Sequence, residues 1–320
     1  MADTNVQLVL NSRDRTAGTY NSSLYNAKGQ NIIQGNIKQI TVSEVNFPYD
    51  IPNIQAGYNS FALEVYQTED PNQMFVITIV PGFYTGTELA TAINDAIDVA
   101  ANEAVPPILL TDVPVVSYGP SANTFYITPP ESPSSPDFQS WVFNSSYTFP
   151  VKNEVLNPTV SLGKDIFSIM GYLPSQSQPF DLTHGGLLVN PVTAPIYSGQ
   201  SAPLVFTQYV DICSPQLCKN QYMSDGSTTN LARRSDVICR LFVCDNVSIT
   251  TAEVDGSRPF IINRQYYNAR MMKWTVGAAV GTVDINLYDD VGQPLTTTWQ
   301  PRPFQITFNC HESIRDEGFR

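Results

Sequence analysis

Charged side chains are scarce in this 320-residue chain, in which Asp, Glu, Lys and Arg make up only 14% of the residues. About a quarter is usual for soluble proteins. Basic residues are the scarcer kind, 17 against 29 acidic ones, and the formal net charge is −12. Binding along nucleic acid requires Lys and Arg to neutralise phosphates, and Arg233-Arg234 is the only adjacent basic pair. We therefore expect no direct role in nucleic-acid binding.

Long apolar runs are also missing, since no stretch approaches the ~18 consecutive apolar residues of a spanning helix. The first residues, Met1-Ala-Asp-Thr-Asn, do not resemble a secretory signal. We expect a soluble protein that is synthesised in the cytoplasm and has no membrane span. In that compartment the five cysteines remain thiols. The sequons at Asn21, Asn144 and Asn246 are then expected to carry no glycan.

Histidine occurs only twice, as His184 and His311. His184 lies in a Thr-His-Gly-Gly loop, but no Ser or Cys in a nucleophile context accompanies it, and Gly-x-Ser-x-Gly is absent. His311-Glu312 lacks the second His of a zincin motif. We predict loop or surface roles for both histidines, no catalytic residues, and a protein that is not an enzyme.

The cysteines offer the strongest alternative chemistry, because they form two C-x4-C pairs, Cys213 with Cys218 and Cys239 with Cys244, and Cys310 precedes a histidine. Such a set can be imagined as a zinc site. However, residues five apart on a strand point to opposite faces of the sheet. We therefore favour buried thiols that pack as small hydrophobic side chains, and we expect no bound metal.

Neither calcium nor nucleotide binding has a sequence signature here. Asp284, Asp289 and Asp290 carry suitable oxygens but lack the spacing of a calcium loop, so we interpret them as turn and strand-edge residues. Gly-x-Gly-x-x-Gly and P-loop motifs are absent, and we expect no cofactor. The sequence does not decide whether two carboxylates form a glycosidase-like pair, because the distance between them depends on the fold.

What the sequence does contain is alternation with a period of two, most clearly near its end. Val283, Ile285 and Leu287 alternate with polar residues, and a turn follows at 289–292. The chain resumes at 295–299 and continues through 304–308. We predict that these two segments form a closing antiparallel pair with one dry face.

Further strand patterns cover most of the chain. Segments 37–47, 61–66 and 74–80 are predicted to form an antiparallel meander, and 113–118 to pair with 124–128. Later strands are expected at 203–213, 236–244, 258–262 and 270–276. One amphipathic helix is predicted from about 87 to 100, capped by Thr85 or Thr87, and a short helix at 164–170 ends at Gly171.

These patterns predict an all-β protein, an antiparallel jelly-roll sandwich with one amphipathic helix and an irregular insertion. Residues 6–10 are a short strand candidate, and the chain from there to Gln34 is polar apart from Ile32-Ile33. Residues 1–36 are predicted to form an N-terminal arm, with a loop wrapped on its own domain as the open alternative. The jelly-roll domain is expected to span 37–320. An elaboration at about 130–200 follows the proline-rich segment 129–136, which marks a boundary.

Several segments, taken in order, resemble the single jelly-roll penton or minor capsid proteins of virophages, Polinton-like elements and large DNA viruses. The resemblance covers most of the chain except roughly 130–160 and 174–200. The matching segments are 9–15 (VLNSRDR), 37–54 with Asn46-Phe47-Pro48, 77–85 (ITIVPGFYT) leading into the helix, 167–173 with Met-Gly-Tyr, and 283–292 followed by Trp299 and 304–308.

The resemblance implies a structural protein of an icosahedral virion, a penton subunit that forms a homo-pentamer at a vertex. It implies contacts with the major capsid protein and other minor capsid proteins, and no active-site residues are carried over from the family. Segment 130–200 is the candidate for a host-recognition feature, since family members carry such features on loops at one end.

Two alternatives stay open at this point. One is a cementing minor capsid protein between the major capsomers, often a trimer. The other is a carbohydrate-binding β-sandwich, in which Trp141, Tyr147 and Tyr197 would line a sugar platform.

Overall fold

The structure is a computed structural model, and the chain forms two compact units in it. Unit 1 consists of Met1–Ile51, Thr207–Thr250 and Pro259–Arg320, and unit 2 of Pro52–Phe206 and Thr251–Arg258. The structure describes residues 5–26, 32, 37–56, 58–67, 73–104, 108, 113–130, 138–144, 166–172, 180–181, 186–189, 195–218, 236–243, 259–274, 279–290, 292–295 and 302–312.

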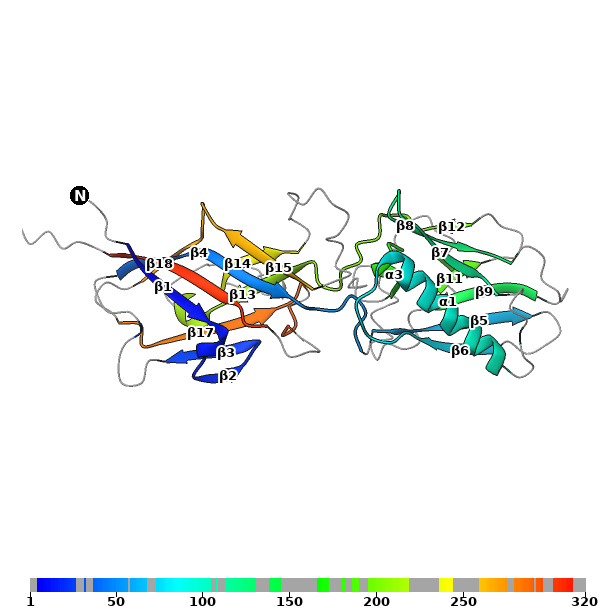
Figure 1. The fold of residues 1–320 in the computed structure, drawn as a ribbon, viewed down its shortest axis with the longest axis horizontal. Helices are drawn as coiled ribbons and strands as arrows, with labels where there is room; N and C mark the ends of the chain where they lie inside the picture. The colour runs from blue at the N-terminus through cyan, green and yellow to red at the C-terminus, as the bar shows by residue number, and fades with distance from the viewer. Residues whose placement is uncertain are drawn as a thin grey trace, which may run out of the picture. The chain divides into compact units, whose positions relative to one another are not determined.

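Unit 1 is a sandwich of two five-stranded antiparallel sheets (Figure 1). The first has the order β1-β18-β4-β15, with β16 also beside β4, and the second has the order β14-β13-β17-β3-β2. The strands are β1 (Asn5–Asn11), β2 (Ala17–Thr19), β3 (Ser22–Asn26), β4 (Ile37–Tyr49), β13 (Tyr209–Cys213), β14 (Val237–Phe242), β15 (Phe260–Gln265), β16 (Met271–Lys273), β17 (Thr282–Tyr288) and β18 (Gln305–Glu312). Two short helices, η1 (Ser12–Asp14) and α4 (Pro215–Cys218), complete the unit.

The pairing of these strands is that of a jelly roll. β1 pairs with β18, β3 with β17, β4 with β15 and β16, and β13 with β14. The first three pairings join an early strand of the unit to a late one, and β13 pairs with the next strand, β14, so the pairs are nested. Successive pairs alternate between the two sheets, as expected when one long antiparallel ribbon is rolled up. In Figure 1 the blue β1 accordingly lies beside the red β18.

Alternation in the sequence accounts for the core between these sheets. Val283, Ile285 and Leu287 of β17 are fully buried, whereas the residues between them are partly exposed, as predicted. From the other sheet, Phe47, Phe304 and Phe308 are also buried. The rings of Phe47 and Phe304 lie 6.3 Å apart, and the edge of Tyr20 contacts Phe304 with ring centroids 5.3 Å apart.

The predicted closing pair is wrong, because β17 and β18 belong to different sheets. The turn at 289–292 does form, and the Leu295 N–H donates back to the Leu287 carbonyl oxygen. Among the described residues, the return includes an antiparallel bridge between Tyr288 and Pro294. β18 then pairs with β1 and β4 in the other sheet, where its apolar face meets the same core from the opposite side.

The N-terminal segment also differs from the predicted arm. Residues 5–11 form β1 along the whole of β18, and residues 22–26 form β3 beside β17. Tyr25 and Leu10 are buried in the core. Segment 5–26 is therefore part of the jelly roll, because its apolar residues, sparse as they are, alternate correctly for two half-buried strands.

Unit 2 is inserted in the chain between β4 and β13. A five-stranded sheet has the order β10-β11-β9-β5-β6, and a three-stranded sheet has the order β12-β8-β7. The elements are β5 (Ser60–Gln67), β6 (Gln73–Thr78), α1 (Gly86–Glu103), β7 (Val115–Gly119), β8 (Thr124–Thr128), β9 (Phe138–Asn144), α3 (Ile166–Ile169), β10 (Phe180–Asp181), β11 (Gly186–Val189) and β12 (Ile196–Tyr197).

Helix α1 confirms the predicted amphipathic helix and selects between its two candidate caps. Thr85 Oγ1 accepts a hydrogen bond from the Glu88 N–H (3.2 Å), and Glu88 Oε2 accepts one from the Thr85 N–H (2.9 Å). This reciprocal capping box satisfies two amides that the helix leaves unpaired. The buried face, with Ile93 and Ile97, packs against β6 and β7.

Other local predictions in unit 2 hold as well. β7 and β8 pair as expected, and α3 ends at Gly171, whose φ of +88° is the left-handed conformation that favours glycine at a helix C-terminus. The meander is only partly right, since β5 pairs with β6 whereas β4 lies in unit 1. The inserted unit also begins near residue 52, well before the predicted elaboration at 130–200, and contains two sheets.

Candidate functional site

The residues that the sequence singled out for chemistry do not come together in a site. Among the residues that the structure describes, no group of three His, Cys, Asp or Glu side chains is placed to hold a metal ion. His184 lies outside the described residues. His311 is on β18, partly exposed, with Nε2 3.4 Å from Thr41 Oγ1.

The cysteines have the packing role that was predicted for them. Cys213, Cys218, Cys239 and Cys310 are buried and form no disulfide, while Cys244 lies outside the described residues. Burial raises the pKa of the Cys239 thiol to about 12 and those of Cys218 and Cys310 to about 11. These thiols therefore stay protonated at neutral pH, the form that is poor both as a nucleophile and as a metal ligand.

The three aspartates act in turns and connections, as predicted. Asp284 Oδ1 accepts hydrogen bonds from Ser214 Oγ (2.9 Å) and from the Gln216 N–H (3.0 Å), which ties β17 to α4. Asp289 Oδ1 accepts one from the Gln293 N–H (2.8 Å) within the turn. Asp290 Oδ2 accepts one from the Gln208 N–H (2.8 Å). Each of the three carboxylates thus binds at least one backbone N–H.

Of the aromatic residues considered for a sugar platform, Tyr197 is the one whose side chain the structure describes. It is 59% exposed and lies against Tyr126 of β8, with ring centroids 5.5 Å apart. Trp141 lies on β9, which is in the other sheet of unit 2, and Tyr147 is outside the described residues. Among the side chains that the structure describes, the tyrosine pair of Tyr126 and Tyr197 is what bears on the predicted platform.

The strongest polar network of unit 1 surrounds Arg240 on β14. Its guanidinium donates to both carboxylate oxygens of Asp211, at 2.6 and 2.8 Å, and its central carbon lies 3.8 Å from the ring centroid of Tyr209. The paired carboxylate raises the pKa of Arg240 further. A bidentate pair that also stacks on an aromatic ring fixes Asp211 of β13 opposite Arg240 of β14.

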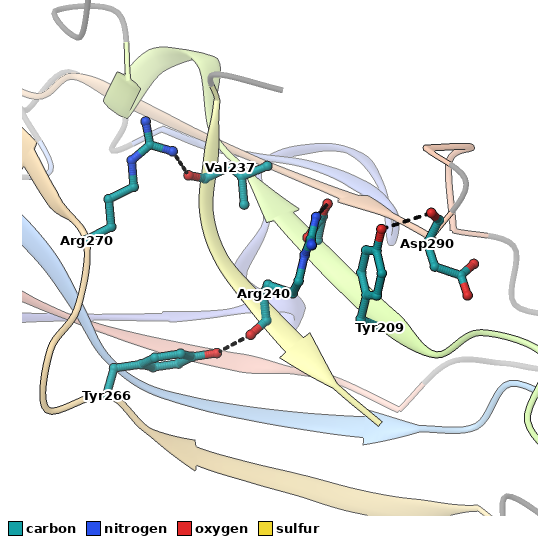
Figure 2. A network of polar contacts seen from close by, with 7 residues as sticks. Tyr209, Val237, Arg240, Tyr266, Arg270 and Asp290 are labelled. Atoms are coloured by element: carbon teal, nitrogen blue, oxygen red, sulfur yellow. Dashed lines mark hydrogen bonds and ion pairs between the residues drawn. The ribbon is translucent and has the colours of Figure 1, made fainter. Parts of the chain in front are cut away.

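The same network covers the outer edge of β14 (Figure 2). Tyr266 Oη donates to the Arg240 carbonyl oxygen (3.0 Å), and Arg270 donates to the Val237 carbonyl oxygen. On β13, Tyr209 Oη donates to the Asp290 carbonyl oxygen (3.0 Å). These contacts occupy backbone groups that an edge strand otherwise leaves open to another chain. The network is therefore structural, and its effect is to close one side of the sandwich.

A second polar cluster lies at the end of β4, where three oxygens are buried without a hydrogen-bond partner: Tyr20 Oη, Tyr25 Oη and Asp50 Oδ1. The other oxygen of Asp50 accepts a long hydrogen bond (3.4 Å) from the Arg302 N–H. Burial raises the pKa of the Asp50 carboxyl, although Arg302 partly opposes the shift. An ionised Asp50 thus costs the fold free energy at neutral pH.

Asp50→Asn is therefore expected to stabilise unit 1 at pH 7. Because the folded-state pKa lies above the unfolded one, the wild type loses stability as the pH rises from about 4 through the folded pKa. The gain from Asp50→Asn should shrink as the pH falls towards 4, because the folded carboxyl is then neutral and the unfolded carboxyl is becoming neutral. Urea unfolding of both proteins between pH 4 and 8 measures this difference. A gain that is constant over the whole range would contradict the assignment to ionisation.

The large apolar side chains that unit 1 leaves exposed follow a pattern. Among the described residues of this unit, each lies on an edge strand or on the turn that joins two of them. They are Val6 and Val9 on β1, Phe242 on β14, Ile261 on β15, Tyr267 in the turn after β15, and Met271 on β16. Tyr267 is 91% exposed and Met271 62%. We call the four residues Phe242, Ile261, Tyr267 and Met271 the β14–β16 rim.

Two solved structures have folds similar to that of the whole chain. The crystal structure of the mavirus penton protein matches with a TM-score of 0.55 and 12% identity, covering 97% of this chain and 100% of that one. A chain of the Sputnik virophage structure matches with a TM-score of 0.52 and 11% identity, covering 98% of each. No family model and no curated protein sequence matches this chain.

At these identities the likeness shows a shared fold. It confirms the predicted all-β antiparallel jelly roll, and it confirms at the level of fold the resemblance to virophage penton and capsid proteins. No helix among the described residues is long and apolar enough to cross a membrane.

Proposed function

We propose that this protein is a structural component of a viral capsid, a penton subunit that forms pentamers in an icosahedral virion and has no enzymatic activity. Its fold is that of the mavirus penton protein over the whole length of both chains. The low content of charged residues suits a protein whose sides are covered by neighbours. Under this proposal it is synthesised in the host cytoplasm and is found in the virion.

The observation that carries the proposal is the placement of exposed apolar side chains on the edges of the jelly roll. A ring of copies forms when one side of each subunit contacts a different surface of the next, a heterologous contact that closes after a fixed number of copies. The β14–β16 rim is one such side. Behind it the Arg240 network makes the edge rigid, so that the rim presents side chains and not free backbone groups.

The proposed place at a vertex of the shell determines which partners we expect. A vertex ring must contact the surrounding shell, so we expect the major capsid protein and other minor capsid proteins as neighbours. Unit 2 is inserted in one connection of the jelly roll, between β4 and β13, and is the candidate for contacts outside the ring. The part of it between 130 and 200 remains our candidate for host recognition.

The mass of the purified full-length protein tests the proposal. Native mass spectrometry should give five copies per ring. Met271→Asp places a charge on the rim and should reduce the pentamer at least about tenfold, since an unpaired charge is costly to bury. Val99→Asp is the matched control: Val99 is 56% exposed on α1 of unit 2 and is not one of the rim residues, so its change should leave the pentamer intact. A stable trimer would favour the cementing role, and a monomer at all concentrations would reject the proposal.

The stacked pair of Tyr126 and exposed Tyr197 is the observation that favours the carbohydrate-binding alternative, because sugars stack on exposed aromatic rings. A glycan array separates the two functions. Hits that disappear with Tyr197→Ala would support sugar binding by unit 2, and an array without hits would count against it.

A further inference from the structure

The two sheets of unit 1 have four edges, and sheet edges attract other strands unless something prevents it. β14 is covered by the side chains of Tyr266 and Arg270. β2 is only three residues long and includes Gly18. The third edge is divided between two separate strands, β15 and the three-residue β16. β15 carries Arg264 and β16 carries Lys273. Short strands, interruptions and basic side chains all oppose pairing with another chain.

The fourth edge, β1, has none of these protections. It runs for seven residues, Asn5 to Asn11, with no charged residue, no proline and no bulge in its pairing with β18. Its inner neighbour is β18, and none of the strands that the structure describes lies on its outer side. Val6 and Val9 are 45% and 52% exposed. A long, uncharged and straight edge strand is the kind that accepts a further strand.

The register shows which backbone groups face outward. The Ser12 N–H donates to the Phe304 carbonyl oxygen, so the residues of β1 that bond to β18 are those two, four and six positions earlier: Leu10, Leu8 and Val6. The N–H and C=O groups of Asn5, Gln7, Val9 and Asn11 therefore point away from the sheet. Within the described part of the chain, no backbone group pairs with the amides of Gln7 and Val9 on this outer side.

An antiparallel copy of β1 can pair with β1 over its whole length. Around Leu8, Gln7 is opposite Val9, Val6 is opposite Leu10, and Asn5 is opposite Asn11 in an antiparallel copy. This is the two-fold register that uses all seven residues. It also places the outward residues opposite one another, Gln7 against Val9, so their free N–H and C=O groups meet as hydrogen-bonded pairs.

We propose that β1 pairs antiparallel with β1 of a second copy of this chain, about a two-fold axis at Leu8. The first sheet then continues across the two copies, and about eight backbone hydrogen bonds satisfy groups that are open in the single chain. Val6 comes to lie opposite Leu10 and loses its exposure. The two asparagine pairs at the ends place neutral polar groups at the borders of the contact.

This contact is distinct from the ring contact that we propose above. An isologous contact uses the same surface on both copies and closes after two, whereas a ring needs two different surfaces. β1 and the β14–β16 rim lie on different strands, so one protein can make both contacts. The β1 contact would then join one ring to another. The strand pairing does not depend on the penton role, and the two ideas are tested by different variants.

Disulfide trapping in the full-length protein tests the register. Across the two-fold axis, Leu8 faces Leu8 as a non-hydrogen-bonded pair, in which Cα atoms are about 4.5 Å apart, within the range of a disulfide. Leu8→Cys should give a covalent dimer under mild oxidation. Val6→Cys is the control: Val6 is an exposed residue on the same strand, but its symmetry mate is several residues away in this register. Equal linking of both variants, or linking of Val6→Cys alone, would overturn the proposal.

A pair of proline variants tests the backbone contact without added thiols. Val9→Pro removes an N–H that points outward, so unit 1 should fold normally while the pairing weakens about tenfold or more, because each dimer loses two hydrogen bonds. Met271→Asp should leave the pairing unchanged. Sedimentation equilibrium measures the association, and circular dichroism checks the fold.

Hydrogen exchange of the wild type supplies the readout if Val9→Pro does not fold. The amides of Gln7 and Val9 should become protected as the protein concentration rises, while those of β2, another edge strand, should not. Fast exchange of Gln7 and Val9 at every concentration would overturn the strand pairing. Loss of the pentamer with the pairing retained would instead reject only the penton role.

Discussion

Replacing Phe308 with alanine is expected to destabilise unit 1 by about 3–5 kcal/mol, a large part of the stability of an ordinary domain. Phe308 is fully buried on β18, the strand that pairs with both β1 and β4. Removing its ring leaves a cavity between the two sheets that strands held from both sides cannot collapse to fill. Amides in β4 and β17 peptides should exchange hydrogen faster in the variant, because these strands border the cavity and unit 1 is less stable.

Asn309→Ala serves as the control, since it changes the next residue of the same strand, whose side chain lies on the outer face. Its effect should stay below about 1 kcal/mol, because its side chain accepts a long, exposed hydrogen bond (3.4 Å) from Gln7. Peptides from β5 in unit 2 should be unaffected by either change if the two cores are separate. A Phe308→Ala protein as stable as Asn309→Ala would contradict the jelly-roll core described here.

The second large effect is expected at Arg240. Arg240→Gln leaves the Asp211 carboxylate, which is 11% exposed, without its bidentate partner. Loss of one member of a fully buried pair costs about 3–5 kcal/mol, and the partial exposure of Arg240 (36%) reduces this to about 2–3 kcal/mol. The register of β14 should loosen, and the pentamer should weaken with it, because the β14–β16 rim rests on this strand.

A double-mutant cycle separates the ion pair from general damage to the strand. Asp211→Asn combined with Arg240→Gln removes both charges and should recover most of the lost stability, with a coupling free energy of about 1–3 kcal/mol. Urea unfolding of the four proteins measures this quantity. Additive effects of the two single changes would mean that the pair does not hold β13 and β14 together.

Local features were predictable because they depend on neighbours in the sequence. Glu88 three residues after Thr85 is a capping box in any context, and Gly171 supplies the left-handed residue that ends α3. Alternation of Val283, Ile285 and Leu287 marks a strand with one buried face wherever that strand lies. The absence of nucleophile, metal-loop and nucleotide motifs could also be seen from residue spacing alone.

Strand partners were less predictable. The alternation in β17 and β18 indicates that each strand has one buried face. Because both sheets bury a face against the same core, the pattern does not tell which sheet a strand belongs to. Proximity in sequence favoured a hairpin, whereas the structure pairs β18 with β1, nearly 300 residues away. The same reason explains β4 and β5, which look like neighbours in a meander and lie in different units.

The candidate sites show the same division. The burial of the cysteines followed from residue type, yet the network of Asp211, Arg240 and Tyr266 joins three segments that carry no shared motif. The open edge of β1 is the clearest example. Its uncharged, self-complementary residues are visible in the sequence, but whether they face a partner depends on which strand lies beside them.

The sequence by itself thus determined which segments are strands or helix, which of their faces are apolar, and that no known catalytic motif is present. Only the tertiary structure decided which strands pair, where unit 2 is inserted, and which of the four edges is left open. The reason is physical: side-chain periodicity and capping act over a few residues, whereas pairing depends on backbone hydrogen bonds and core packing between segments that are distant in the chain.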